Sequence, residues 1–270
     1  MTETAALSLR AGRPEDYAAF ARLFLELVVP EPPPPPEVWE AELLPSSLFY
    51  DGPQGPVAYA VAEVMGELGY VVNLVVDASA RRQGLGRRMM EAVAARFQAR
   101  GCRSWGLTVK RDNTAALALY ASLGMKPLRE AATLRLSREH LEVLPPAPPG
   151  LRVVPAVEAE WEALTAAFRM TPGKLARFSL RIGHQLLRLE RPGDADFAGL
   201  GVMDLRSGGV ISPFFAATPG HARVLLEDAF QRTGASVLHA VVTDDAPLER
   251  LLRGAGAGVD METLQMQGPL

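Results

Sequence analysis

The chain has 270 residues, 48% of them hydrophobic and 22% charged, with a formal net charge of −3 and a pI near 5.9. This length suits one large or two ordinary domains, and the composition is that of a globular protein. The slightly acidic balance excludes the overall basic charge of a typical nucleic-acid-binding protein, so we expect no nucleic acid as a partner.

Cysteine usage and the first residues bear on the cellular location. Cys102 is the only cysteine, so an intrachain disulfide is impossible and a reducing cytosol is expected. The start of the chain lacks a basic stretch followed by an apolar core, and no apolar run reaches the roughly 18 residues of a membrane span. These patterns predict a cytoplasmic protein with no membrane partner.

The first 69 residues mix strand and helix patterns. Residues 7–10 predict a strand, and Pro14, followed by two acidic residues, predicts the start of a helix that ends by Pro30. The proline run at 32–36 is interpreted as a stiff spacer. The remaining predicted elements are a helix at 37–44, strands at 48–50 and 57–65, and turns at 51–53 and 66–69.

Residues 70–124 carry the most informative pattern. An apolar run at 70–76 predicts a strand, and a loop then closes with the sequence Arg-Arg-Gln-Gly-Leu-Gly at positions 81–86. Helix-period patterns at 87–100 and 113–124 flank a second predicted strand at 104–109. Strand, glycine-rich turn and helix in this order hold phosphorylated ligands in many α/β proteins.

The glycine-rich loop is predicted to bind a pyrophosphate. Gly84 and Gly86 remove side chains where backbone amides must approach an anion, and the following helix points its unpaired amides at the same place. Arg81, Arg82, Arg87 and Arg88 add positive charge; the alternative is a turn with a solvated arginine face. The Gly-Lys-Ser/Thr of a P-loop and the third glycine of a dinucleotide fingerprint are both missing.

Two motifs resemble the GNAT superfamily of N-acetyltransferases. Residues 81–86 resemble its Q/R-x-x-G-x-G/A motif, and residues 113–125 resemble its N-x-x-A-x-x-L-Y-x-x-L-G-F segment, with Met125 for the usual Phe. The resemblance covers residues 5–137 and is specific around 70–126. The sequence is especially similar to the branch that includes bacterial ribosomal-protein N-terminal acetyltransferases. The resemblance implies acetyl-CoA as cosubstrate, a primary amine as acceptor and a strand pair that splays apart to admit the cofactor.

The resemblance also assigns roles to individual residues. Tyr120 is implied to be the general acid that faces the leaving CoA sulfur, although packing on a buried helix face would also explain a tyrosine there. The resemblance supplies no general base, because Tyr70 and Thr108 stand where relatives often have a glutamate, and neither is a base at pH 7. Glu63, just upstream, is the candidate base and would act through water; the alternatives are Glu67 and ordered water alone. The implied acetyl-CoA contacts are Leu74, Val75, Val76, Arg81, Arg82, Gln83, Gly84, Leu85, Gly86, Arg87 and Asn113. We expect no metal ligands, because the histidines are dispersed.

The second half of the chain repeats the first in outline. Residues 101–109 align with 234–242 at an offset of 133, and the preceding strands, 71–76 and 210–215, align at 139. The second copy is therefore 6 residues shorter where the first has its glycine-rich loop. By the offset of 133, the second copy has Ala246 at the position of Asn113 and Arg253 at the position of Tyr120. We infer an internal duplication whose second copy does not bind acetyl-CoA; the alternative is two α/β domains that share an element order by chance.

These observations predict an α/β (α+β) protein of two tandem GNAT-like domains, each with a mixed, mostly antiparallel sheet flanked by helices. The predicted boundaries are 1–143 for the catalytic domain, 144–150 for a Pro-rich linker and 151–270 for the degenerate copy. The predicted activity is acetyl transfer from acetyl-CoA to an amine in a ternary complex. The alternative is a non-catalytic acyl-CoA sensor or interaction protein. We expect a monomer or weak dimer in which the two domains act as a pseudo-dimer.

Overall fold

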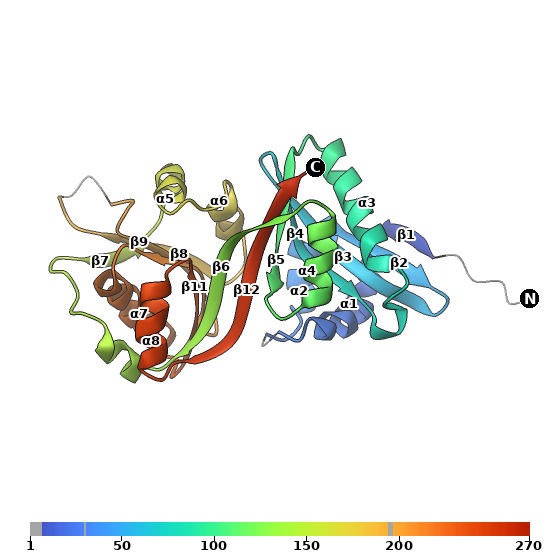
Figure 1. Cartoon of the computed structure of the whole chain (residues 1–270). Helices are drawn as coiled ribbons and strands as arrows, with labels where there is room; N and C mark the ends of the chain where they lie inside the picture. The colour runs from blue at the N-terminus through green and yellow to red at the C-terminus, as the bar shows by residue number, and fades with distance from the viewer. Residues whose placement is uncertain (1–6, 30, 194–196) are drawn as a thin grey trace, which may run out of the picture. The chain divides into compact units, whose positions relative to one another are not determined.

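The computed structural model describes residues 7–29, 31–193 and 197–270, and these form two compact units (Figure 1). The first unit contains the residues up to Val109, Asn113–Pro127 and Met266–Leu270. The second contains Lys110–Asp112 and Leu128–Gln265. The predicted α/β class, with mostly antiparallel strands flanked by helices, is confirmed.

The first unit alternates strands with helices. Its elements are β1 (Ser8–Ala11), α1 (Tyr17–Phe24), α2 (Pro36–Val38), β2 (Ser47–Gly52), β3 (Gly55–Met65), β4 (Leu68–Val76), α3 (Leu85–Ala99), β5 (Ser104–Lys110) and α4 (Thr114–Ser122). Short helical turns lie at Pro14–Asp16, Leu25–Leu27, Trp39–Leu43, Leu44–Ser46 and Ala78–Ala80.

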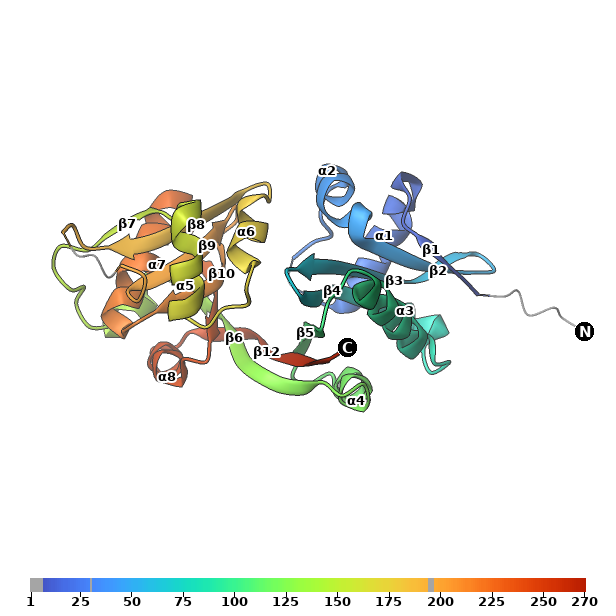
Figure 2. The same ribbon diagram turned by 90° about the horizontal axis from the view of Figure 1, so that it is seen from above.

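The sheet of the first unit runs in the order β1-β2-β3-β4-β5, antiparallel except for the parallel pair β4 and β5. Phe20 of α1 and Trp39 pack on one face of this sheet against Tyr59 and Val75. α3 covers the opposite face (Figure 2), where Phe97 lies so close to Gly69 that a Cβ on that glycine would stand 2.3 Å from the ring. Gly69 is therefore a strand residue, and the predicted turn is shorter than 66–69.

The second unit repeats the same sequence of elements. They are β6 (Lys126–Leu136), which enters this unit at Leu128, then β7 (Arg152–Pro155), α5 (Trp161–Ala167), α6 (Lys174–Ser179), β8 (His184–Glu190), β9 (Gly201–Arg206), β10 (Val210–Ala216), α7 (Pro219–Thr233), β11 (Leu238–Thr243), α8 (Ala246–Gly254) and β12 (Gly258–Pro269). Helical turns lie at Arg138–Val143 and Glu158–Glu160.

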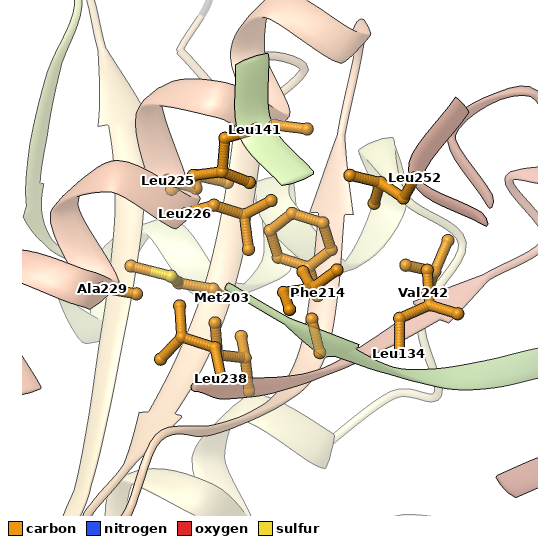
Figure 3. Packing of buried hydrophobic residues seen from close by; sticks show 14 of the residues in the cluster. Leu134, Leu141, Met203, Phe214, Leu225, Leu226, Ala229, Leu238, Val242 and Leu252 are labelled. Carbon is orange, nitrogen blue, oxygen red and sulfur yellow. The ribbon is translucent and has the colours of Figure 1, made fainter. Parts of the chain in front are cut away.

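The main core of the second unit lies between its sheet and α7 (Figure 3). Phe214 and Met203 from neighbouring strands meet Leu225 and Leu226 of α7, and all four side chains are buried. A smaller cluster on the other face joins Leu164 of α5 and the α6 side chains to β9. Each unit therefore buries a two-layered apolar interior of its own.

Each sheet is completed by a strand that the repeat would assign to the other copy. β6 is the sixth strand of the first copy, yet it pairs with β11, with Leu134 opposite Ala240. β12 ends in the first unit, where its last residues lie beside β5: a Cβ on Gly106 would stand 2.9 Å from the Met266 carbonyl oxygen. The two copies have exchanged their last strands.

This exchange alters several sequence-based expectations. The apolar pattern predicts two strands at 125–128 and 131–136, but residues 126–136 form the single strand β6, and Leu134 and its alternate neighbours pack in the second core. The 144–150 segment, proposed as the linker, lies within the second unit, where the buried Leu144 accepts a hydrogen bond from Arg223 at 3.0 Å. Packing places the continuous segment Leu128–Gln265 in the second unit.

Among the described residues, every helix is too short or too polar to span a lipid bilayer. The same residues contain no group of three or more histidine, cysteine or carboxylate side chains that could bind a metal ion.

Candidate active site

The pairing of the two parallel strands in the first unit stops before either strand ends. β4 and β5 pair from Leu68 opposite Ser104 as far as Val71 opposite Leu107, whereas β4 continues to Val76. On its other side β4 stays paired with β3 to its last residue. Beyond Val71 the backbone groups of β4 that point away from β3 are not paired with β5, and the predicted Leu74, Val75 and Val76 lie on this stretch.

A β-bulge determines which side chains face the helices at this point. Asn73 pairs with Val61 and Val71 pairs with Ala62, so Val72 is the extra residue in β4. An extra residue reverses the alternation of side chains beyond it. In a regular strand Gly69 and Val75 would face the same side, because an even number of positions separates them. Instead Gly69 faces α3 and Val75 packs on the α1 face.

The glycine-rich loop ends at an open helix N-terminus. Gly84 has a φ of 75°, which favours glycine, and it provides no side chain to cap α3. The first hydrogen bond of the helix runs from the Arg88 amide to the Gly84 carbonyl, at 3.1 Å. The amides of Leu85, Gly86 and Arg87 precede that bond, so they and the helix dipole form a ready site for an anion.

The four loop residues before Leu85, namely Arg81, Arg82, Gln83 and Gly84, are all exposed. Arg81 is held by hydrogen bonds from its guanidinium to the Val76 carbonyl oxygen and to Glu26. Gln83 donates a long hydrogen bond to the Ser79 carbonyl oxygen, at 3.4 Å. Positive charge and open amides thus share one exposed surface, as pyrophosphate binding requires.

Helix α4 lies next to this helix N-terminus. Arg87 donates to the Ser122 hydroxyl at 2.6 Å. A Cβ on Gly86 would stand 3.4 Å from Leu119 and 3.9 Å from Val76. The structure therefore brings the end of β4, the start of α3 and the last turns of α4 together at one place.

Asn113 and Tyr120 sit at the two ends of α4. The Asn113 side-chain oxygen caps the helix by accepting from the Ala116 amide at 3.1 Å, which leaves the amide Nδ2 to donate elsewhere. Tyr120 is 7% exposed, and its burial raises the pKa of the phenol to about 12. Tyr120 is therefore fully protonated near neutral pH.

Glu63 lies elsewhere on the sheet. It stands opposite Tyr70 in the β3–β4 pair, five residues along β3 from Ala58, the partner of Val76. At ~3.3 Å per residue this is roughly 17 Å from the end of β4. The Tyr70 hydroxyl bonds to Thr108 of β5 at 2.7 Å, just past the point where the strands part. No pattern in the sequence indicates this contact.

The second unit lacks these features at the matching places. Alignment of α4 with α8 by their first residues gives an offset of 132, so Asp245 and Leu252 are the counterparts of Asn113 and Tyr120. The sequence-based offset of 133, which selected Ala246 and Arg253, was wrong by one residue here, because the loop before α8 is one residue shorter. The conclusion that neither the asparagine nor the tyrosine is repeated stays the same.

Comparisons with known proteins identify relatives of this chain. A model of the acetyltransferase (GNAT) family matches residues 17–125. A mycothiol acetyltransferase from Clavibacter michiganensis subsp. michiganensis is 31% identical over 247 residues, which cover 81% of this chain and 79% of that protein. A ribosomal protein bS18-alanine N-acetyltransferase from Escherichia coli is 39% identical over 67 residues, 25% of this chain. The match covers 45% of that enzyme, so it spans less than half of its length.

The solved structure of a tandem GNAT protein from the clavulanic acid biosynthesis pathway matches at a TM-score of 0.64 with 14% identity, and it covers 98% of each chain. At this identity the similarity concerns the fold alone. It confirms the predicted tandem architecture.

Proposed function

Because the chain belongs to the GNAT family of acetyltransferases, we propose that its first unit transfers the acetyl group of acetyl-CoA to a primary amine by direct attack in a ternary complex. The observation that carries this proposal is the early end of the β4–β5 pairing at Val71, beside the uncapped N-terminus of α3. Unpaired strand amides and carbonyls suit the amide-bearing pantetheine arm, and the helix end suits the pyrophosphate.

The proposed cofactor contacts follow from this arrangement. Leu74, Val75 and Val76 would pair with the pantetheine amides, and the loop of residues 81–86 together with Arg87 would hold the pyrophosphate. The free Nδ2 of Asn113 would donate to a pantetheine carbonyl. The capping bond to Ala116 supports this role, because it fixes the direction in which the side-chain amide points.

The chemistry requires one bond to form and one to break. The neutral amine nitrogen attacks the thioester carbonyl carbon, and negative charge develops on the carbonyl oxygen, where a backbone amide at Val75 or Val76 would stabilise it. The carbon–sulfur bond then breaks and the thiolate leaves. The amide product is released with its surplus proton transferred to the sulfur, directly or through water.

Tyr120 would act as the acid at the sulfur. A thiol has a pKa near 8.5, whereas burial raises the pKa of Tyr120 to about 12. Because the phenol is the weaker acid, it stabilises the developing thiolate by donating a hydrogen bond. The proton that finally rests on the sulfur comes from the ammonium formed by the attack.

Glu63 is the proposed base, acting through water. Its place opposite Tyr70 puts it one strand from the point where β4 and β5 part, roughly 17 Å from Val76, so the proton would travel along a chain of water molecules. The hydrogen bond between Tyr70 and Thr108 lies across that point and would help to hold ordered water there. Glu63→Gln is expected to lower kcat most strongly at low pH, where the amine acceptor is protonated.

The deciding experiment is acetyl-CoA-dependent thiol release with a panel of amines. The panel includes a peptide with N-terminal alanine and the acceptor of a mycothiol acetyltransferase, chosen from the activities that name the two relatives. Turnover with any amine supports the proposal. Tight acetyl-CoA binding without turnover on the whole panel would favour the alternative, a non-catalytic acyl-CoA sensor.

A further inference from the structure

Two ion pairs join α1 and the turn after it to the pyrophosphate loop of the first unit. Arg22 of α1 pairs with Asp77, and Glu26 pairs with Arg81 at 2.6 Å. Arg22 also donates to the Pro56 carbonyl oxygen at 2.9 Å. Both ends of the loop that precedes Gly84 are therefore tied to one helical segment.

The spacing and the charges of the two pairs match. Arg22 and Glu26 are four residues apart, which places them one helical turn apart on the same face. Asp77 and Arg81 are also four residues apart and carry the opposite order of charge. The register of the loop against the helix is thus determined by two complementary contacts, because a shift of one turn would place like charges together.

Asp77 is itself a rigid anchor. Its backbone amide donates to the Val57 carbonyl at 2.8 Å, and its carboxylate accepts from the amide and the hydroxyl of Ser79. These hydrogen bonds and the Arg22 guanidinium lower the pKa of Asp77 to about 2. The start of the loop is consequently fixed, and its far end depends on the Arg81 side chain.

The Arg81 guanidinium uses part of its hydrogen-bonding capacity on the protein. Its Nε donates to the Val76 carbonyl oxygen at 3.0 Å and its Nη2 donates to Glu26. A guanidinium has five N–H donors in one plane, so the remaining donors are held in a defined direction for a ligand. A half-exposed ion pair of this kind adds little to stability, so its importance would lie in orientation.

The second copy has neither the pyrophosphate loop nor the residues that brace it. When α1 and α5 are aligned by their first residues, Ala166 and Met170 stand where Arg22 and Glu26 stand in the first copy. The bracing charges thus occur only in the copy that has a loop to brace.

We propose that Glu26 is a positioning residue for acetyl-CoA, which orients the Arg81 guanidinium toward the pyrophosphate before the cofactor binds. This inference rests on the proposed function of the first unit. Pre-orientation improves binding because less side-chain freedom is lost when the complex forms. The acetyl transfer itself is remote from the pyrophosphate, so kcat should be unaffected.

The test measures equilibrium binding of acetyl-CoA to the full chain by titration calorimetry. Glu26→Gln should raise the Kd about 5- to 10-fold and raise the KM for acetyl-CoA alike, with kcat unchanged. In an Arg81→Ala background, Glu26→Gln should have no further effect, because the side chain it orients is gone. Glu227→Gln breaks a comparable exposed pair with Arg223 in the second unit and should leave the Kd unchanged.

The direction in which Glu26→Gln changes the Kd for acetyl-CoA decides whether the inference holds. An unchanged Kd would overturn the inference, and so would a lower Kd, since Glu26 would then compete with the pyrophosphate for Arg81. If Glu26→Gln raised the Kd by the same factor in the Arg81→Ala background, the inference would also be overturned, because the effect would then be a general one on folding. If the wild-type chain binds no acetyl-CoA, the proposed function fails first, so the two failures are distinguishable.

Discussion

Two parallel strand pairs, β4–β5 in the first unit and β10–β11 in the second, begin alike and end differently. β10 carries an extra residue between Ile211 and Phe214, as β4 carries one at Val72. After the bulge β10 resumes its pairing with β11, with Phe214 opposite Val242, whereas β4 does not rejoin β5. A bulge alone therefore does not open a sheet; the residues beyond the bulge decide whether the strands part.

The helices after these strands show the same contrast. Gly84 precedes α3 and provides no side-chain cap. Thr218 precedes α7, and its hydroxyl accepts from the His221 amide at 3.3 Å. The Pro-rich segment covers the start of α7 as well: a Cβ on Gly220 would stand 3.1 Å from the Pro146 carbonyl oxygen. One helix end is left open for an anion, while the other is closed by its own chain.

Together these differences satisfy, within the second copy, backbone groups that stay open in the first. The loop is 6 residues shorter, the strands stay paired and the helix end is capped and covered, while Phe214 and Val242 join a continuous core. Each of these features satisfies backbone groups that a ligand would otherwise satisfy. The comparison predicts that acetyl-CoA affects the first unit alone.

The largest effect is expected for Gly84→Glu. This substitution places a carboxylate among the phosphate oxygens and a side chain at a backbone φ of 75°, so acetyl-CoA affinity should fall by at least about 100-fold. Isothermal titration measures the loss. Gly84→Asn, which tolerates this backbone conformation, should retain much of the binding.

Gly254→Glu is the matched control in the second unit. Its added side chain meets open space at the end of α8, so binding should be unchanged. If Gly84→Glu binds acetyl-CoA like the wild type, the assignment of the loop is wrong.

Next in size is Tyr120→Phe, which should lower kcat by roughly 100-fold with little change in the KM for acetyl-CoA. Burial raises the pKa of Tyr120 to about 12, so the phenol keeps its proton up to about pH 10. The wild-type kcat should therefore show no decline with pH from loss of that proton over pH 7–10. Steady-state kinetics across this range measures both quantities.

Tyr59→Phe is the control for this loss of a hydroxyl. Tyr59 is also buried in the first unit, in the cluster that faces α1, and it has no assigned role. Its variant should keep the wild-type kcat. Equal rates for Tyr120→Phe and wild type would leave Tyr120 as a packing residue.

Much of the site was predictable because it is local in sequence. The apolar run at 70–76 and the glycines after it indicated β4, the loop and α3, with the start of α3 misplaced by two residues. That error arose because Leu85 follows directly on Gly84, whose left-handed conformation begins the helix earlier than the apolar pattern does. The cap at Asn113 agrees with the predicted helix start as well.

The exchange of last strands was not predictable by the same reasoning. β6 and β12 both alternate apolar and polar residues, and such alternation specifies a face without specifying a partner strand. The polar pair Arg129 and Glu130 interrupts the apolar pattern of β6, which led to two predicted strands. Non-local pairing of this kind depends on the whole fold, as does the ion pair between Glu26 and Arg81.

Hydrogen exchange should sharpen the contrast between the strand pairs. Acetyl-CoA should slow the exchange of amides at residues 72–76 and 84–87 by roughly 10-fold, because a bound ligand suppresses local opening. Residues 210–216 and 219–223 should show no change. Mass spectrometry of peptides from both regions, with and without acetyl-CoA, measures the difference. Equal protection of the two regions would mean that the second copy binds the cofactor too.

The smallest effects concern the helix caps, and one substitution separates capping from ligand binding. Asn113→Asp keeps the oxygen that accepts from the Ala116 amide, so thermal stability should hold, whereas removal of the cap by Asn113→Ala should cost about 1 kcal/mol. Asn113→Asp also replaces the Nδ2 donor with a charged oxygen, and it should raise the KM for acetyl-CoA several-fold.

The second copy supplies the reference for that experiment, because its helix α8 is naturally capped by aspartate. Asp245 accepts from the Leu248 amide at 3.0 Å, in the same geometry as Asn113. Asp245→Asn should change the free energy of unfolding by no more than about 0.5 kcal/mol and should leave the KM for acetyl-CoA unchanged. If Asn113→Asp leaves the KM unchanged while Asn113→Ala destabilises the protein, Asn113 only caps α4, and both copies use this position for the same structural purpose.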